Sequence, residues 1–277
     1  MDKILPKISV IMPFYNAKDF LAQAVESILN QTFADFELII INDASTDNSE
    51  QIIQPFLADK RIVYVKNDKN QGIVNNLNYG LKIAKAEIIA RMDGDDVSLP
   101  TRLEEQFQFL LENHNIAAVG SFVKIIDENS QEIDQRTKPI DPQVIKNNLI
   151  IYSPLVHPAT MFRKSIILQV GGYRNQYLYV EDIDLWYRLV YSGFKISNVS
   201  KFLLGYRYHK NSTANQAKAN AKRAFKLRME TIKRFRLKIS FKQYLLIYAQ
   251  LIAGLILSGR QRQHLEGIYK KIVYHDK

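Results

Sequence analysis

Short apolar runs of strand length alternate, over the first 111 residues, with segments in which apolar residues recur at helical spacing. The run 38–41 is unbroken, as expected for a strand covered on both faces, whereas the apolar positions between residues 20 and 29 lie three and four apart. We predict strands in 7–14, 36–43, 61–67 and 87–92, and helices that begin near residues 19, 48, 72 and 98. This alternation predicts an α/β fold with a Rossmann-like, mostly parallel central sheet and helices on both faces.

The last of these helices carries a start signal, because Ser98 is expected at its N-cap and Pro100 in its first turn. The pattern is less regular after this helix. It then predicts a strand and a short helix in 157–173, an amphipathic helix in 180–194 and further strand structure in 195–212. These segments complete a body that ends near residue 210.

Polar clusters follow three of the predicted strands at the point where each strand ends. Their sequences are PFYN (13–16), NDAST (42–46) and DGDD (93–96). In parallel α/β sheets, ligands bind in the crevice outside the carboxyl ends of the strands. We therefore expect the three clusters to meet at one edge of the sheet and to form a single site.

Charge divides the 277 residues into two parts. Of the 38 Lys and Arg and 28 Asp and Glu, segment 211–277 holds 15 and 3, so the remaining 23 and 25 leave 1–210 nearly neutral. We expect 1–210 to be the main domain and 211–277 a basic, helical C-terminal extension. There is no cysteine, which excludes disulfides, a thiolate nucleophile and Cys-based metal sites.

The extension contains the apolar run YLLIYAQLIAGLIL (244–257), which is shorter than the roughly 20 residues that a membrane-spanning helix needs. Three roles stay open: packing on the body with a solvated basic face, dimerisation, and contact with an anionic membrane surface. No nucleic-acid recognition module is visible, so we expect no nucleic-acid partner. The first ten residues lack the apolar segment of a secretory signal, and we expect a cytoplasmic protein, peripheral at the inner face of the cell membrane if the extension binds lipid.

Asp93, Asp95 and Asp96 crowd three carboxylates into four positions, with Gly94 among them. Carboxylates so close cannot all ionise without compensating cations or hydrogen-bond donors. Hard oxygen ligands at a strand end suit Mg²⁺ or Mn²⁺. The alternative is a solvated turn whose acids favour the following helix. The neighbouring polar clusters favour the metal.

The other two strand ends have the side chains of a nucleotide pocket. The ring of Phe14 or Tyr15 can lie against a base, and Asn16 and Asp43 can bond to a base edge or a ribose. Taken separately, each cluster is equally consistent with a strand-ending turn or a helix cap.

A second acidic group, Glu181, Asp182 and Asp184, begins the helix predicted in 180–194. The helix dipole favours acids there, but a carboxylate in a cleft also suits a general base. Asp182 and Asp184 point in different directions round the helix, so they should not share one role. Arg207 and His209 together have the chemistry to bind a diphosphate.

Together, three stretches resemble the family 2 glycosyltransferases of the GT-A fold that build bacterial cell-surface polysaccharides. They are 8–49, 89–106 and 180–189, and the resemblance covers roughly residues 6–210. It implies an inverting transfer from a nucleotide-diphosphate sugar, commonly UDP-linked, to a hydroxyl of a glycan or a lipid-linked oligosaccharide.

The resemblance also implies residue roles. Asp182 would be the catalytic base; Asp93 and Asp95 would hold Mn²⁺ or Mg²⁺, with His209 at the metal or the diphosphate. Nucleotide-sugar contacts would come from eleven residues: Pro13, Phe14, Tyr15, Asn16, Asp43, Asn70, Arg91, Asp93, Asp95, Glu181 and Arg207.

One position departs from the family pattern. Many members have an arginine after an Asn-x-Gly turn, whereas this chain has Leu77 there, and Arg91 is expected to supply the missing positive charge. Two other readings stay open. A nucleotidyltransferase lacks support, since there is no Gly-rich, Lys-bearing phosphate loop near the first strand. A non-catalytic sugar-nucleotide-binding or membrane-adaptor protein would be expected to have lost Asp95 or Asp182. A homo-oligomer is compatible with the sequence.

Overall fold

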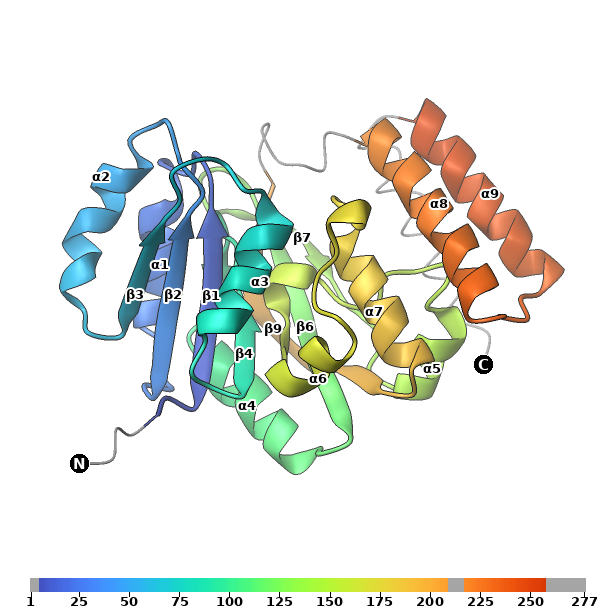
Figure 1. Cartoon of the computed structure of the whole chain (residues 1–277), viewed down its shortest axis with the longest axis horizontal. Coiled ribbons are helices and arrows are strands. Elements are labelled where there is room, and N and C mark those ends of the chain that lie inside the picture. Colours follow the sequence, from blue (N-terminus) through green and yellow to red (C-terminus); the bar gives the residue numbers. More distant parts are fainter. Residues whose placement is uncertain (1–4, 209–216, 258–277) are drawn as a thin grey trace.

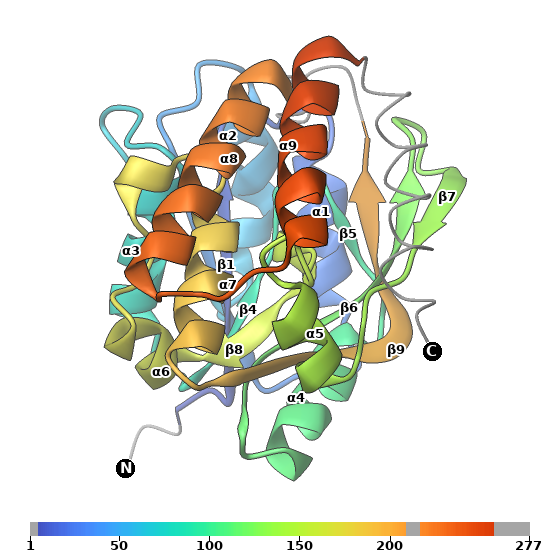
Figure 2. The same cartoon turned by 90° about the vertical axis from the view of Figure 1, so that its right-hand side faces the viewer.

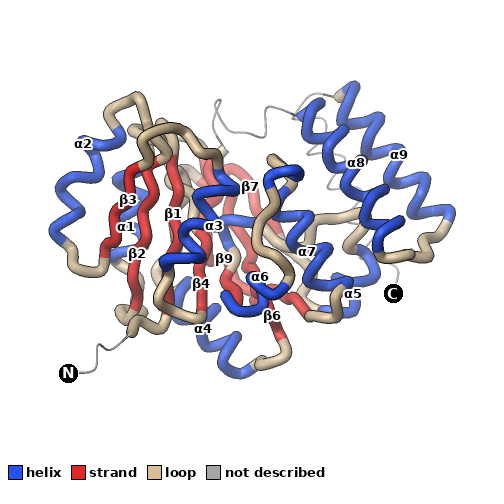
Figure 3. Tube along the Cα trace, viewed as in Figure 1, coloured by secondary structure: helices blue, strands red, loops and turns tan. Residues whose placement is uncertain are grey.

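A nine-stranded sheet lies at the centre of the computed structural model, which describes residues 5–208 and 217–257 (Figures 1 and 3). Its order is β3-β2-β1-β4-β8-β6-β9-β5, with β7 paired to β6. The strands are β1 (Ile8–Phe14), β2 (Phe36–Asn42), β3 (Ile62–Lys66), β4 (Ile88–Arg91), β5 (Val97–Ser98), β6 (Ile116–Ile126), β7 (Glu132–Arg136), β8 (Met161–Arg163) and β9 (Lys195–Arg207). The half β3-β2-β1-β4 is parallel throughout, as the alternation predicted, and β6 is parallel to β9. The short β8 joins the two groups, antiparallel to both neighbours.

Helices cover both faces of this sheet, as predicted (Figure 1). They are α1 (Leu21–Leu29), α2 (Ser49–Ile53), α3 (Ile73–Ile83), α4 (Arg102–Glu112), α5 (Pro142–Asn148), α6 (Lys164–Gln169), α7 (Glu181–Tyr191), α8 (Ala217–Arg234) and α9 (Phe241–Ile256), with 3-10 turns η1 (Gln54–Ala58), η2 (His157–Ala159) and η3 (Asn175–Tyr177). Side chains that alternate along β1 enter separate cores: Ile11 packs with residues of α3 and α7, whereas Val10 and Met12 pack with residues of α1 and α4. The apolar side chains of β2 also supply both cores, Ile39 and Ile41 the first and Leu38 and Ile40 the second.

The expected cap at Ser98 is wrong. Ser98 lies in β5, where it pairs with Leu204 of β9, and its backbone N–H donates to Ser27 Oγ at 3.0 Å. Helix α4 begins only at Arg102, after Thr101. Pairing with a strand about one hundred residues away decides this boundary, and a local capping pattern carries no information about that partner.

The basic extension packs on the body through α8 and α9, which lie side by side, α8 against α7 and α9 against the end of α5 and the residues after it (Figure 2). Leu227 of α8 and Ile247 of α9 are buried in the same core as Trp186 of α7. Gln250 of α9 also donates to the carbonyl of Ile151 at 2.9 Å. Of the three roles left open for the extension, the described helices therefore show packing on the body. In the part of the chain that the structure describes, no helix is both long and apolar enough to cross a membrane.

Asp184 of α7 anchors the body rather than the site. Its carboxylate, only 2% exposed, pairs with Arg188 at 2.8 Å and with Arg174. Arg188 in turn donates to the carbonyls of Val170 and Gly172, so one ion cluster ties α7 to the turn at the end of α6. The expectation that Asp182 and Asp184 serve different purposes agrees with this geometry.

Asp184→Asn is expected to lower the free energy of unfolding by about 3–5 kcal/mol, because it leaves buried arginine charge without its partner. Denaturant unfolding measures the loss as a lower midpoint concentration, with the dependence of the free energy on denaturant (the m-value) unchanged. The exposed Asp134→Asn serves as the matched control and should lie within about 0.5 kcal/mol of the wild type. A similar midpoint for both variants would contradict the structural role of Asp184.

Candidate active site

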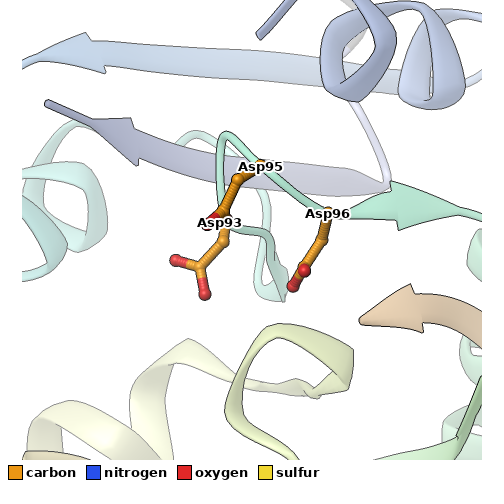
Figure 4. A group of neighbouring side chains, drawn as sticks. All are labelled: Asp93, Asp95 and Asp96. Atoms are coloured by element: carbon orange, nitrogen blue, oxygen red, sulfur yellow. The ribbon is translucent and has the colours of Figure 1, made fainter. Parts of the chain in front are cut away.

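Asp93, Asp95 and Asp96 lie on the loop between β4 and β5, and their carboxylates are directed to the same side of it (Figure 4). One oxygen of each lies within 4.8 Å of one oxygen of the others. Asp93 and Asp95 are partly exposed, whereas Asp96 is 1% exposed. The loop therefore presents two accessible carboxylates above a buried one.

Close packing and Arg207 hold this loop in place. A Cβ atom added to Gly94 would lie 2.9 Å from Phe14 Cβ, so glycine is required here by space. The main-chain N–H of Arg207 donates to Asp96 Oδ1 at 2.8 Å, and its Nε donates to the carbonyl of Asp95 at 2.7 Å. The other guanidinium nitrogens of Arg207 bond to the 127–130 turn and to Gln23. Arg207 thus positions the acidic loop; its partner in the predicted diphosphate contact, His209, lies outside the described residues.

Burial and mutual repulsion raise the pKa values of two of these carboxylates. Burial, with the negative charges of Asp95 and Asp93, raises the pKa of Asp96 well above its ordinary value. Asp93 accepts from Arg91 Nη1 at 2.5 Å, yet burial leaves its pKa raised. Asp96 Oδ2 is buried and has no hydrogen-bond partner. A cluster of hard oxygen ligands with one orphaned oxygen fits a divalent cation, which would relieve this repulsion.

Arg102 lies beneath the loop, and the sequence reasoning missed it. Arg102 is the first residue of α4, and its side chain is fully buried. Its guanidinium donates to the carbonyls of Arg91 at 2.6 Å and Thr160 at 3.3 Å. Burial lowers the pKa of Arg102 to about 9, while the charge of Asp96 opposes that shift. An arginine in an amphipathic helix pattern is ordinarily exposed, so periodicity carried no signal. The one sequence signal for Arg102 was its place in 89–106, a stretch that resembles the glycosyltransferase family.

On the nucleotide side, the structure separates the two aromatic candidates. Phe14 is 5% exposed and packs in the core with Met12, whereas Tyr15 is 49% exposed. The amide oxygen of Asn16 accepts from the N–H of Thr46 at 2.8 Å, which ties the loop after β1 to the loop after β2. Pro13 lies just before these residues, within β1. Of the two rings, Tyr15 is therefore the one available to lie against a base.

Asp43 shapes the adjoining loop. Its Oδ1 accepts from Asn67 Nδ2 and from the N–H of Gln71, and its Oδ2 accepts from the N–H of Gly72 at 2.9 Å. These bonds organise the 67–72 turn that carries the exposed Asn70. The first two strand ends are thus brought together, as predicted, by the Asn16–Thr46 bond, and Asp43 joins the second of them to the turn after β3.

Backbone conformations on three of these loops are unusual. Asn16, Ala44 and Tyr179 all have positive φ, at 51°, 57° and 71°. Asparagine tolerates this region, but alanine and tyrosine adopt it only where the surroundings enforce it. The first two follow β1 and β2, and Tyr179 precedes the acidic start of α7. Strain of this kind collects at functional sites, and here it marks the loops that carry the candidates.

Glu181 and Asp182 are the candidate site residues in the first turn of α7. Burial and the neighbouring charge of Asp182 raise the pKa of Glu181 to about 7. Burial also raises the pKa of Asp182, against the backbone N–H of Ile183 and the charge of Arg91. Glu181 is buried, while Asp182 is partly exposed, so Asp182 is the carboxylate open to a ligand.

Arg91 connects the acidic loop with the start of α7. Its guanidinium bonds to Asp93 and its charge lowers the pKa values of Glu181 and Asp182. Arg91, which we expected to supply a positive charge to the site, thus acts electrostatically on both acidic clusters.

Tyr173, which sequence reasoning also missed, is a buried residue that interacts electrostatically with Arg91. His157 Nε2 and Tyr173 Oη lie 2.9 Å apart, and the His157 ring stacks edge-on against Trp186 at 6.2 Å. Burial, followed by the charge of Arg91, lowers the pKa of His157 well below its ordinary value, so the ring is neutral. The Gly171–Gly172 turn before Tyr173 was the signal that could have drawn attention to it.

Comparisons with known proteins agree with this arrangement. The family model "Glycosyl transferase family 2" matches residues 9–171. The chain is 37% identical over 221 residues to the O-antigen biosynthesis glycosyltransferase WbnJ of Escherichia coli, covering 78% of this chain and 85% of that protein. It is 33% identical over 223 residues to the UDP-Gal:alpha-D-GlcNAc-diphosphoundecaprenol beta-1,3-galactosyltransferase of Escherichia coli, covering 75% and 76%.

Among solved structures, the mannosyltransferase PcManGT of Pyrobaculum calidifontis, in complex with GDP-Man and Mn²⁺, superposes with a TM-score of 0.64. It is 16% identical, and the match covers 93% of this chain and 72% of that one, which establishes the shared GT-A fold. The acidic loop, the paired strand-end loops and the carboxylates of α7 thus occur in a chain whose relatives are glycosyltransferases. The protein belongs to glycosyl transferase family 2.

Proposed function

We propose that the protein is a metal-dependent, inverting glycosyltransferase that acts in cell-surface polysaccharide synthesis. It would move a sugar from a nucleotide-diphosphate sugar, with UDP the expected nucleotide, to a hydroxyl of a glycan or lipid-linked oligosaccharide. The observation that carries the proposal is that Arg91 pairs with Asp93 of the acidic loop while its charge also lowers the pKa values of Glu181 and Asp182. The cytoplasmic location expected from the sequence belongs to the same proposal.

The donor would lie along the edge formed by the three loops. The ring of Tyr15 would lie against the base, and the turn that Asp43 organises, with Asn70, would border the ribose. The diphosphate would lie at the acidic loop beside Arg91, the buried cation nearest to Asp93. A divalent cation, Mn²⁺ or Mg²⁺, held by Asp93 and Asp95 would neutralise the charge that develops on the leaving diphosphate.

Asp182 would act as the base. Its carboxylate takes the proton of the acceptor hydroxyl while that oxygen bonds to the anomeric carbon, and the bond to the diphosphate oxygen breaks on the opposite side, which inverts the configuration. Glu181 tunes the base, since two neighbouring carboxylates retain a proton to higher pH than one carboxylate alone. Arg91 limits this effect by favouring the ionised forms.

Two of the comparisons support the finer parts of this proposal. The name of the galactosyltransferase relative specifies a UDP-sugar donor and a diphosphoundecaprenol-linked acceptor, and PcManGT was solved with Mn²⁺. The fit of the loop 93–96 to a divalent cation rests on this chain's own residues.

Calorimetric titration with UDP-, GDP- and TDP-sugars, each with Mn²⁺ or with EDTA, tests the donor site. We expect one nucleotide class to bind, and to bind at least about tenfold more weakly in EDTA, because the diphosphate then faces uncompensated carboxylates. Binding of no donor under either condition would overturn the proposal in favour of a non-catalytic protein of the same fold.

A further inference from the structure

Helix α9 exposes an apolar stripe on the side that faces away from the body. Six of the thirteen large apolar side chains that are exposed in the described residues lie on this one helix. They recur at helical spacing, so they share one face. The stripe consists of Phe241, Tyr244, Leu245, Tyr248, Ile252 and Ile256.

The opposite face of α9 packs against the rest of the protein. Ile247 is fully buried, and Gly254 faces α8 so closely that an added Cβ would lie 2.3 Å from Ala221 Cβ. Ser240 caps the helix through a capping box with Gln243. The helix is therefore held by one face, and the exposed stripe is not needed to anchor it.

Exposed basic side chains lie on the helix next to the stripe and at the start of α9. Lys222, Lys226 and Lys233 of α8 are exposed and lie at helical spacing, and Lys242 is exposed at the start of α9. The two helices lie together at the outer end of the molecule (Figures 1 and 2). In the described part of α8, Glu230 is the acidic residue of this region, against a surplus of lysine and arginine. A lysine-rich border around an apolar stripe is the pattern of a helix that lies in a membrane interface.

We propose that α8 and α9 form a docking surface for an anionic lipid bilayer. The stripe inserts among the acyl chains, and the lysines contact headgroup phosphates. Charge complementarity selects this occupant: a second copy would bring the same positive charge to the contact, and a nucleic acid would leave the apolar stripe without a partner.

Docking would also bear on the loop before Asp182. Tyr177 Oη donates to Glu230 of α8 at 2.9 Å, and the guanidinium of Arg223 lies 4.7 Å from the centre of the Tyr179 ring. The docking helices thus support the segment that leads into α7. Docking would thereby bring Asp182 to a lipid-linked acceptor, and this consequence rests on the proposed function. The docking of α8 and α9 on a bilayer does not depend on that function.

Co-sedimentation of the full chain with vesicles tests the proposal without using activity. We expect binding to vesicles of phosphatidylcholine with phosphatidylglycerol to be at least about tenfold tighter than to pure phosphatidylcholine, and to weaken as salt is raised. Leu245→Ser/Ile252→Ser and Lys222→Gln/Lys226→Gln/Lys233→Gln should each lower it about tenfold.

Matched controls alter equally exposed side chains elsewhere: Ile133→Ser/Leu168→Ser for the stripe, and Lys7→Gln/Lys60→Gln/Lys195→Gln for the charge. Their vesicle binding should equal that of the wild type. Three outcomes would overturn the proposal: equal binding to both vesicle types, equal losses in variants and controls, or a dimer in light scattering that Leu245→Ser/Ile252→Ser dissociates. Binding of RNA in place of vesicles would reassign the surface to nucleic acid.

Discussion

Asp182→Asn is expected to lower kcat by about 10²–10⁴-fold and to leave donor affinity nearly unchanged. The amide keeps the shape of the side chain but cannot take the acceptor proton. Asp182 is the partly exposed member of the acidic pair at the start of α7, and the charge of Arg91, which bonds to Asp93, lowers its pKa. Single-turnover transfer measures the chemical step, and calorimetry with the donor measures binding.

The pH profile distinguishes this role from a structural one. Because burial raises the pKa values of both Glu181 and Asp182, the pair keeps a proton to higher pH, and kcat/KM should rise as pH passes upward through an apparent pKa near about 7. Glu181→Gln removes one charge of the pair, so the rise should shift to lower pH. Full activity of Asp182→Asn would refute the assignment of the base, and an unchanged profile in Glu181→Gln would refute the coupling.

Asp95→Ala is expected to abolish the difference between donor binding in Mn²⁺ and in EDTA and to lower kcat/KM by about 10²–10³-fold. Asp95 is one of the two partly exposed carboxylates of the loop 93–96, and its removal leaves Asp93 and the buried Asp96 without the third ligand. Calorimetry with and without EDTA measures the first effect, and initial rates measure the second.

Asp134→Asn, an exposed change on β7, is the control and should behave as the wild type. Asp95→Ala also relieves charge repulsion on Asp96, so the folded protein should be no less stable than the wild type. Retained metal dependence in Asp95→Ala would place the cation elsewhere. Lost activity together with lost stability would show that Asp95 supports the fold.

Much of the architecture was predictable because it depends on local periodicity. The apolar run 38–41 of β2 and the spacing within α1 allow one structure each, and the polar ends of β1, β2 and β4 follow from where the apolar runs stop. Parallel pairing then brings those ends to one edge of the sheet. The acidic loop and the acids of α7 were recognisable for the same reason, since their chemistry is written in consecutive residues.

Burial and side-chain partners could not be read in this way. Phe14 and Tyr15 are adjacent aromatics, and only packing against Met12 and its neighbours assigns one to the core and the other to the surface. Arg102 looks like an exposed helix residue until the fold brings the carbonyls of Arg91 and Thr160 to its guanidinium. Such contacts join positions far apart in the chain, which no local pattern records.

The sequence by itself therefore determined the α/β class, the alternation of strands and helices in its first half and the acidic residues of the candidate site, because each depends on residues close together in the chain. The tertiary structure alone decided that Arg207 holds the acidic loop, that β5 replaces a cap at Ser98, and that α9 buries one face and exposes the other. The physical reason is that hydrogen bonds and burial depend on which distant segments meet, and these meetings exist only in the folded chain.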